Sequence, residues 1–584
     1  MPIIQTVIQG GGTTPTGTLP ITANGVYNVT DYASADVQVP TTAPARYFAF
    51  SVDANGNLVN DTTQTSIMNF NGIKNIANQR TPSLDYCYYN NTNITGTITF
   101  PDLEQIGSNT RSNGMQYAFY NCSNITEVSF PKLKIIQQGS LSGCFSGCGN
   151  LETISFPELI FVNNSGMTYT FQNCAKIQKA SFPKLWAILQ SSNLFANCQL
   201  LDELNIPVLN VIPSQALMQA FENTSLTTVN FTGLCHIDNS SLQTAFKNSS
   251  IENIYFPALA SFGNTNCFTN MLQGCSNVTL HFPSDISSTI QTCSGYPNFG
   301  GTNTTVLFDL PAIDGVCNYT GLTSWTSENY LPQASMFNKS FIKQAIFSNL
   351  KIITSGFYNT SFSGSSLLTK VDFSKVEQMS ANLGNSIFSN CPNLTEIKFD
   401  SLVSTTSNVF SATFTGTNLA NLSLYSLKNM TSQSMFSNFT NSTITNIYFS
   451  SISESSELNR SCFNTITNAS SITAHFPKNL DPQTGSTKIS SLNSYSVNFG
   501  FGSLAFDLPS TYTLTGADTI EYERNPKDDT ATALAWRKVG YDADGFVLDW
   551  TSYYTNTTND PQVNDTIYSD AACTTAVTTI SSIA

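Results

Sequence analysis

The chain is poor in charged residues. Only 11% of its 584 residues are Asp, Glu, Lys or Arg, and the formal net charge is −14. Nucleic-acid recognition depends on clustered Lys and Arg contacts to phosphate, and the sequence has no such cluster. We therefore expect no nucleic-acid partner.

Long apolar runs are also missing. No stretch approaches the roughly 20 apolar residues that cross a bilayer, so no membrane insertion is expected. The first residues, Met1-Pro-Ile-Ile-Gln-Thr-Val-Ile8, contain no charged start and no apolar core of signal-peptide length. If this is the native start, we expect no export by the usual secretory route.

Residue patterns that carry catalysis are scarce. The chain has three histidines, His236, His281 and His475, and neither a phosphate-binding loop nor a nucleophile elbow. Glycosidase chemistry needs two carboxylates at a fixed separation. Asp372 and Glu396 both point outward, in adjacent repeats, but neighbouring Lys398 favours a surface charge pair. The sequence predicts no enzymatic activity, no cofactor and no metal site.

What the sequence does contain is a repeat. Seventeen short segments end in an apolar anchor residue, and most anchors lie 24 to 27 residues apart. A fixed period in this range is typical of a solenoid, because one unit cannot bury its apolar face alone. The anchors are Phe70, Phe100, Phe130, Phe156, Phe182, Ile206, Phe231, Phe256, Phe282, Phe308, Phe347, Phe373, Phe399, Leu424, Phe449, Phe476 and Phe506.

Each unit has a common internal order. The phrase Val128-Ser129-Phe130 alternates inward and outward, which predicts a short strand, and Pro131 ends it. Later in the unit, residues such as Leu217, Ala220 and Phe221 have helical spacing. The predicted fold class is therefore an α/β solenoid, in which each coil contains a strand, a turn, a short helix and a polar turn.

The repeat resembles a known family. The segment Phe119-Tyr-Asn-Cys-Ser-Asn-Ile-Thr-Glu-Val-Ser-Phe-Pro131 resembles leucine-rich repeats of the BspA type, and the resemblance covers roughly residues 66 to 510. It implies a leucine-rich-repeat solenoid. Members of that family are mainly adhesion and recognition proteins with many different partners, so the resemblance implies a binding surface without naming the ligand.

Six of the fourteen cysteines occupy one column of the repeat. Thr224 and Ser249 replace cysteine in two coils, so a small side chain that closes a turn explains the column, although neighbouring coils are close enough for disulfides. Cys144 lies four residues before one column member but has no histidine nearby, which argues against zinc. The structural column is Cys122, Cys148, Cys174, Cys198, Cys275 and Cys391.

The outward column of the strands is the candidate binding surface. In each of two arrays this column ends in Tyr then His, and each array closes on Phe-Asp-Leu-Pro, at Phe308–Pro311 and Phe506–Pro509. These pairs suit either of two roles. They are inherited capping structure, or they are a polar-aromatic patch that stacks on a sugar ring or a peptide. The candidate binding residues are Tyr255, His281, Tyr448 and His475.

The flanks differ from the repeats. Residues 1–45 contain the segment Ile21–Pro40, which has a hairpin signal at Asn24-Gly25 and resembles a short module of phage tail and fibre proteins. Residues 511–584, including Val563–Asp570, also resemble small all-β modules at the ends of phage appendage proteins. The expected organisation is an attachment segment (1–45), a first array (46–311), a connector (312–340), a second array (341–510) and a small β domain (511–584).

Together these features predict a non-enzymatic phage virion appendage protein of tail or head fibre type. Its N-terminal segment would bind other virion proteins and its array would bind a host surface glycan or protein. A homo-oligomer is the assembly considered for it. A phage protein needs no signal peptide, because virions assemble inside the host. The alternative is a BspA-type cell-surface adhesin of a bacterium or a protist. A polysaccharide-degrading tail spike is the third hypothesis.

Overall fold

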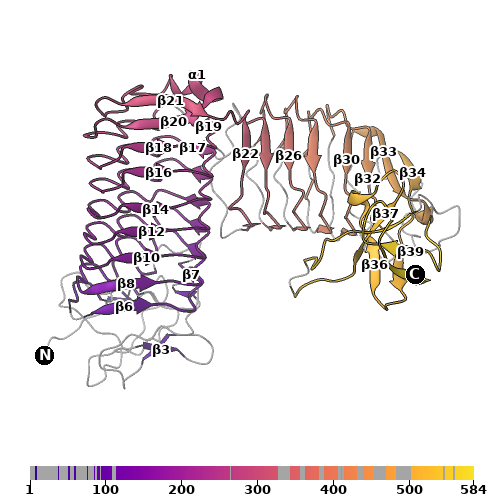
Figure 1. Ribbon diagram of the computed structural model, residues 1–584, viewed down its shortest axis with the longest axis horizontal. Coiled ribbons are helices and arrows are strands. Elements are labelled where there is room, and N and C mark those ends of the chain that lie inside the picture. Colours follow the sequence, from indigo (N-terminus) through magenta and orange to yellow (C-terminus); the bar gives the residue numbers. More distant parts are fainter. Residues whose placement is uncertain are drawn as a thin grey trace. The chain divides into compact units, whose positions relative to one another are not determined.

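The fold is seen in a computed structural model. It describes residues 7–8, 37–38, 50–52, 58–60, 75–76, 84–85, 88–92, 94–107, 114–263, 265–326, 342–354, 362–380, 387–405, 409–410, 413–430, 439–452, 468–481, 501–543, 546–556 and 560–584. The chain divides into two compact units, Met1–Gly321 and Leu322–Ala584. Each is a stack of coils joined by parallel strands (Figure 1).

In the first unit, one face of the stack is built from the strands that precede the anchors. Neighbouring coils pair in parallel, so that Ile154 lies between Val128 and Ala180, and the pairing is interrupted once, between Asn205 and Thr228. The strands are β6 (Gly96–Thr99), β8 (Ile125–Ser129), β10 (Thr153–Ser155), β12 (Lys179–Ser181), β14 (Glu203–Asn205), β16 (Thr228–Asn230), β18 (Asn253–Tyr255), β20 (Thr279–Pro283) and β21 (Thr305–Leu310).

A second parallel sheet follows the turn after each anchor. Its two-residue strands pair in the order β5 to β19 along the stack. These strands are β5 (Asn75–Ile76), β7 (Gln105–Ile106), β9 (Ile135–Ile136), β11 (Phe161–Val162), β13 (Ala187–Ile188), β15 (Val211–Ile212), β17 (His236–Ile237) and β19 (Ser261–Phe262).

The third side of the coil, which we call the turn face, is not helical. In the segment with apparent helical spacing, Gln215, Gln219 and Asn223 have φ values of 62°, 54° and 56°, which no right-handed helix contains. The amide of Leu217 donates to the next coil, at Ser241 O (3.0 Å). The α/β prediction is therefore wrong in its helical part: left-handed residues at every fourth position give the same apolar spacing as a helix.

Helix content is low throughout the part of the chain that the structure describes. Its one α-helix, α1 (Ser287–Ile290), has four residues and follows a 3-10 turn, η2 (Ser284–Ile286). Two further 3-10 turns, η5 (Lys478–Leu480) and η7 (Pro526–Asp528), lie in the second unit. The fold is a parallel-strand solenoid whose turn face hydrogen-bonds from coil to coil.

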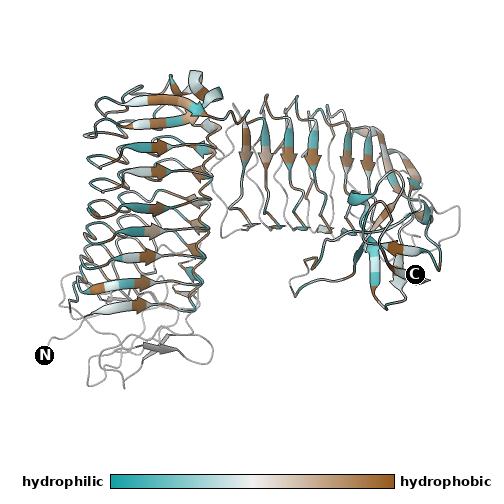
Figure 2. Ribbon diagram, in the orientation of Figure 1, coloured by the Kyte–Doolittle hydropathy of each residue, from teal (hydrophilic) through white to brown (hydrophobic). Residues whose placement is uncertain are grey.

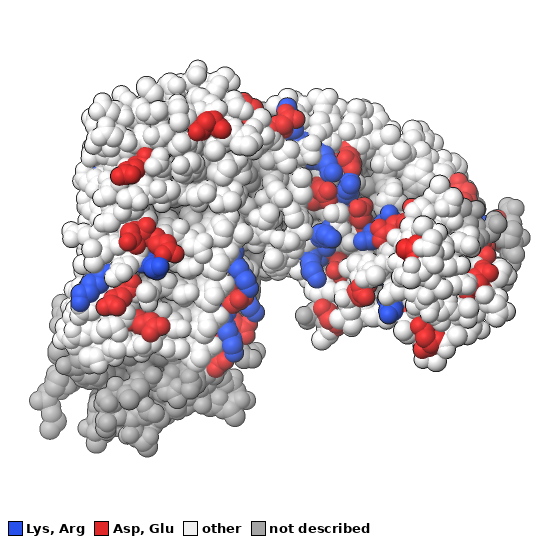
Figure 3. All heavy atoms as spheres, in the orientation of Figure 1, with Lys and Arg blue, Asp and Glu red and all other residues white. Residues whose placement is uncertain are grey.

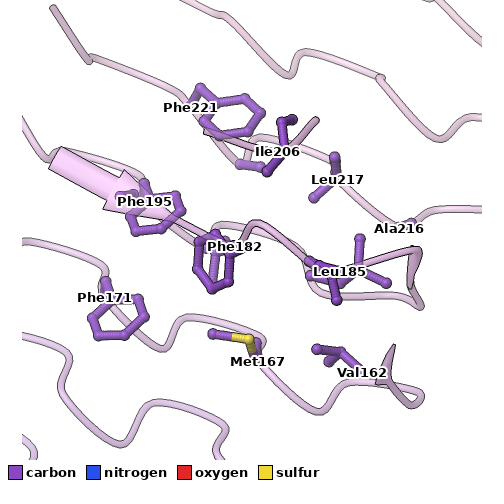
Figure 4. Packing of buried hydrophobic residues seen from close by; sticks show 14 of the residues in the cluster. Val162, Met167, Phe171, Phe182, Leu185, Phe195, Ile206, Ala216, Leu217 and Phe221 are labelled. Carbon is purple, nitrogen blue, oxygen red and sulfur yellow. The ribbon is translucent and has the colours of Figure 1, made fainter. Parts of the chain in front are cut away.

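The core is built from columns of stacked phenylalanines. Anchor rings stack between coils, with Phe156 and Phe182 centroids 5.3 Å apart. A second column comes from the turn face, where Phe171 and Phe195 are 5.5 Å apart (Figure 4). Each such pair contributes about 0.5–1.5 kcal/mol beyond its buried area. Hydrophobic and hydrophilic residues alternate along the strands (Figure 2). The outward side chains do not fill the core, so their identity can vary from coil to coil.

The second unit repeats this plan. Its anchor rings also stack, with Phe347 and Phe373 centroids 4.7 Å apart. The strands before the anchors are β24 (Gln344–Ile346), β26 (Lys370–Asp372), β28 (Glu396–Lys398), β30 (Asn421–Ser423), β32 (Asn446–Tyr448), β33 (Ala469–Pro477) and β34 (Phe501–Leu508). The second-sheet strands are β23 (Ser324–Trp325), β25 (Ile352–Ile353), β27 (Gln378–Met379), β29 (Ser404–Thr405) and β31 (Asn429–Met430).

A closed antiparallel β-barrel ends the chain, at the position expected for the small β domain. Trp536 and Tyr522 are among its buried core residues. The barrel packs against the second array, where Lys428 forms an ion pair with Glu523 and Thr511 Oγ1 donates to Ile452 O (3.0 Å). Its strands are β35 (Thr513–Gly516), β36 (Glu521–Arg524), β37 (Leu534–Lys538), β38 (Tyr553–Thr555), β39 (Thr566–Tyr568) and β40 (Ala576–Ile583).

Short strands are described near the N-terminus. β1 (Val7–Ile8) pairs antiparallel with β2 (Val37–Gln38), and β3 (Phe50–Val52) pairs antiparallel with β4 (Leu58–Asn60). The predicted turn at Asn24-Gly25 and residues 327–340 of the predicted connector lie outside the described residues. The described start of that connector includes β22 (Val316–Asn318) and packs on the first array, where Gly321 N donates to Asn210 Oδ1 (3.1 Å).

Candidate recognition surface

The outward strand column of the first unit ends in a stacked pair of rings. Tyr255 in β18 and His281 in β20 occupy the same rung position in adjacent strands. Their ring centroids are 4.1 Å apart with an interplanar angle of 10°. Tyr255 is half-buried and His281 only 8% exposed. Tyr255 is therefore the more solvent-exposed residue of the pair.

Both edges of the His281 ring meet polar side chains. Its Nδ1 lies 2.9 Å from Asp309 Oδ2, and its Nε2 lies 3.5 Å from Asn253 Oδ1. Asp309 comes from β21, whose register with β20 shifts between His281 and Pro283. Such a shift redirects a side chain, and here the aspartate lies beside the histidine. We call Asn253, Tyr255, His281 and Asp309 the first Tyr–His cluster.

The second unit contains the same cluster. Tyr448 stacks on His475 at 4.6 Å, and His475 Nδ1 lies 2.9 Å from Asp507. Its Nε2 lies 2.9 Å from Asn446 Oδ1. The register shifts here too, since Phe476 pairs with Phe506 and Pro477 with Leu508, which leaves Asp507 as the extra residue. Asn446, Tyr448, His475 and Asp507 form the second Tyr–His cluster.

The clusters do not have the geometry of a hydrolytic dyad. In a Ser-His-Asp triad the nitrogen opposite the aspartate faces the nucleophile. In the second cluster that nitrogen, His475 Nε2, faces Asn446, whose Nδ2 donates in turn to Asn421 Oδ1 (2.9 Å). The imidazole is held on both edges, and what the cluster presents outward is the partly exposed tyrosine and its amide neighbours.

The aspartates and asparagines of these clusters were not identified from the sequence. The signal was present, because Asp309 and Asp507 belong to the repeated Phe-Asp-Leu-Pro phrase. The alternation of inward and outward residues along a strand does not reveal a register shift, however, so it could not place either aspartate beside a histidine. The predicted tyrosines and histidines are brought together in pairs within each unit, and the bulge supplies the carboxylate.

The cysteine column consists of buried free thiols. Cys174 Sγ donates to the carbonyl of Phe145 in the preceding coil (3.0 Å), and Cys391 Sγ donates in the same way to Phe362 (2.9 Å). Burial raises the pKa of Cys198 to about 12, so this thiol stays protonated at neutral pH. The column links coils through thiol–carbonyl contacts: Cys122, Cys148, Cys174, Cys198, Cys275 and Cys391.

The carboxylates considered for glycosidase chemistry are ion-paired. Lys370 Nζ lies 3.5 Å from Asp372 and 3.7 Å from Glu396, and Lys398 Nζ lies 3.5 Å from Glu396. Burial raises the pKa of Asp372, but hydrogen bonds from Ser374 and the lysine charges outweigh it, and the net shift is downward. A general acid needs a raised pKa, so Asp372 is not suited to that role.

Family membership follows from the repeat region. The model of the BspA type leucine rich repeat region matches residues 81–217, 113–244, 169–273, 329–470 and 382–499, which together cover more than half of the chain. The chain belongs to the BspA-type leucine-rich-repeat family. This chain is also similar to a solved leucine-rich repeat protein from Bacteroides ovatus, with a sequence identity of 14%. The match covers 83% of this chain and 96% of that one, with a TM-score of 0.25.

No curated protein matches this BspA-type chain. Within its described residues, no group of three or more His, Cys, Asp or Glu side chains is placed to hold a metal ion. Among the same residues, no helix has the length and apolar character needed to cross a bilayer. Function therefore has to be argued from the repeat surface itself.

Proposed function

We propose that this protein is a non-enzymatic recognition protein of a cell surface, where the arrays bind a host glycan or a host protein. Membership of the BspA-type family supports this proposal, since adhesion and recognition are what the resemblance implies. The alternative hypothesis from the sequence is thus favoured over the virion appendage.

One observation carries the proposal. The outward column of β8 to β20 runs Ser129, Ser155, Ser181, Asn205, Asn230, Tyr255 and His281 along two ladders of parallel strands, β6 to β14 and β16 to β21. Those side chains vary from coil to coil, whereas the inward residues remain apolar. A rigid scaffold with variable, partly exposed polar and aromatic side chains is typical of a binding surface.

The virion hypothesis rested on the terminal segments. The family match begins at residue 81 and ends at residue 499, so it reaches neither the 1–45 segment nor the 511–584 barrel. Attachment to other virion proteins, tail-spike activity and homo-oligomer formation remain predictions from the sequence.

The proposal is tested in two steps. Protease treatment of intact cells that express the native gene should degrade the protein while a cytoplasmic marker remains whole. Purified protein should then bind intact host cells in a saturable manner, and heat-unfolded protein should not. Protection of the protein from protease, or absence of saturable binding, would refute the surface recognition role.

A further inference from the structure

A group of tyrosines lies on the turn face at the N-terminal end of the first array. Tyr89, Tyr117 and Tyr120 are partly exposed and Tyr169 is 38% exposed. They come from three coils, and backbone hydrogen bonds between coils position them. Tyr117 N donates to Ser142 O (2.9 Å), and Tyr169 N donates to Ser192 O (3.0 Å).

The rings form an aromatic corner. Tyr89 and Tyr120 stack at 4.8 Å, and Tyr117 meets Tyr120 edge to face at 5.7 Å with an interplanar angle of 70°. The ring of Tyr117 also lies across Gly143 in the next coil, where an added Cβ would approach it to 2.3 Å. Partial burial raises the pKa of Tyr117, and its phenol interacts with those of Tyr169, Tyr120 and Tyr89. The phenol of Tyr117 therefore lies within electrostatic reach of the other three.

Two of these tyrosines occupy costly backbone positions. Tyr117 and Tyr169 have φ values of 52° and 57°, in the left-handed region that bulky side chains disfavour. The same column holds Gly143 and Asn193 in neighbouring coils, which are residues suited to that conformation. Residues held in such conformations cluster at functional sites. Gln219 and Thr244 have the same left-handed conformation further along the column, so the conformation belongs to the turn face and tyrosine is its bulkiest occupant.

The part of the turn face that the structure describes around the corner is uncharged. The described turn-face residues of these coils, 88–92, 114–121, 139–147 and 165–173, contain no Asp, Glu, Lys or Arg. Asp85, just before them, is buried and accepts the amide of Gln116 (2.7 Å). Amide side chains flank the rings, including Asn121, whose Nδ2 donates to Asn90 Oδ1 (3.0 Å). Figure 3 shows that most of the visible described surface is formed by other residues, with Lys, Arg, Asp and Glu gathered in patches.

We propose that Tyr89, Tyr117, Tyr120 and Tyr169 form a binding platform for an uncharged carbohydrate chain. The apolar face of a sugar ring packs on the tyrosine rings, and its hydroxyl groups hydrogen-bond to the phenols and to Asn90 and Asn121. A neutral ligand fits because no charge on the platform would compensate a charged one. The platform is distinct from the Tyr–His clusters, and it rests on the proposed recognition function because it names a ligand class for it.

The test uses a double variant, Tyr120→Ser with Tyr169→Asn. Each substitution introduces the residue found at the same position of the next coil, namely Ser146 and Asn193. The fold therefore already accommodates both changes, and Tyr169→Asn relieves an unfavourable φ. The matched control is Tyr120→Phe with Tyr169→Phe, which keeps both rings. Probes are immobilised neutral oligosaccharides of glucose, mannose, galactose and N-acetylglucosamine, with hyaluronate and polygalacturonate as acidic comparators.

Wild-type protein should bind at least one neutral oligosaccharide. The Ser/Asn variant should lose about tenfold or more in affinity at an unchanged or higher Tm. The Phe control keeps the rings and loses two phenols, so it should lose less affinity than the Ser/Asn variant. Binding only to acidic glycans or to proteins overturns the platform, and so does undiminished binding by the Ser/Asn variant. If that variant still adheres to cells like wild type, the platform fails and surface recognition stands. If wild type binds neutral glycans but no cells, the recognition role fails instead.

Discussion

The indole Nε1 of Trp550 donates a 3.2 Å hydrogen bond to Glu377, a residue of the second array that lies 173 positions earlier in the chain. The other oxygen of Glu377 accepts the amide of Val547 at 2.6 Å, and Glu377 is only 3% exposed. One buried carboxylate of the solenoid thus holds two donors of the C-terminal barrel.

Glu377→Ala should weaken this attachment. It leaves the donors of Trp550 and Val547 without their acceptor in a buried site, which costs about 1–3 kcal/mol. Urea unfolding should show that loss, and limited proteolysis should release residues 511–584 earlier than in wild type. The matched control is Glu396→Ala, whose side chain is 47% exposed and should change stability by less than about 0.5 kcal/mol. Equal effects of the two variants would contradict the docking role.

Cys174→Ser should be tolerated. The hydroxyl retains a donor for the carbonyl of Phe145, and Ser249 occupies the same column, so a loss of about 1 kcal/mol is expected. Thiol titration should find the column cysteines unreactive in native protein and free after denaturation. By contrast, Leu204→Asp should cost several kcal/mol, because Leu204 packs on the core and aspartate places a charge there. Loss of free thiols under denaturing, non-reducing conditions would show that the cysteines are paired.

Asn197→Ala should destabilise the first array more than Asn197→Gly. Asn197 has φ of 66°, donates to Asn173 Oδ1 (2.8 Å) and accepts from Asn223 Nδ2 (2.6 Å). Alanine loses both hydrogen bonds and keeps the unfavourable φ, for a cost of about 2 kcal/mol, whereas glycine removes the strain. Thermal unfolding of the two variants measures the difference. An identical Tm would mean that the left-handed conformation carries no cost here.

Tyr255→Ala combined with Tyr448→Ala should weaken attachment to host cells with little change in Tm. Both tyrosines are partly exposed, and a duplicated contact raises avidity on a repetitive polymer. Cell-adsorption assays measure the effect, with Ser129→Ala and Ser155→Ala as controls in the same column. Normal adsorption with a large drop in Tm would instead assign the Tyr–His clusters to array capping.

Stability should fall below neutral pH partly through His236. This residue is wholly buried in β17, and burial lowers its pKa to about 4, against an opposing effect of Asp238. Between that value and about 6.5 the unfolded chain binds a proton that the folded chain does not. The stabilisation is therefore complete above pH about 6.5 and is lost toward pH 4, by at most about 3 kcal/mol.

His236→Gln provides the test of that dependence. The variant has no titrating group at this position, so its urea midpoint should change less between pH 7 and pH 4.5 than the wild-type midpoint does. His281 and His475 are retained in both proteins and cancel in the comparison. Parallel pH profiles for the two proteins would rule out His236 as a source of the acid sensitivity.

The strands were predictable because two local signals agree. Val128 and Phe130 point inward around Ser129, and Pro131 ends the strand, so the sequence identifies both the face and the boundary. The turn face was mispredicted because Leu242, Ala245 and Phe246 have helical spacing. Left-handed residues at Ser240 and Thr244 produce the same spacing in a chain of turns.

The partners of the candidate site depend on contacts that no local pattern contains. Tyr255 and His281 could be placed in one column from the repeat period, but Asp309 reaches them through a register shift. The link between Glu377 and Val547 joins a repeat to a domain that follows no repeat. The aromatic corner was missed because its four tyrosines fall in the segments of the repeat that the sequence predicts as helix.

The main-chain hydrogen bonds between coils have a consequence for how the sequence of such a protein can evolve. In the first array, main-chain hydrogen bonds join adjoining coils through the second sheet and the turn face, and also through the strands before the anchors except between β14 and β16. An outward side chain therefore contributes little to holding its own coil in place. Substitutions there should be nearly neutral for folding and still alter what the surface meets. Selection can therefore act on one rung at a time, and a lineage can acquire a new ligand without passing through an unstable intermediate.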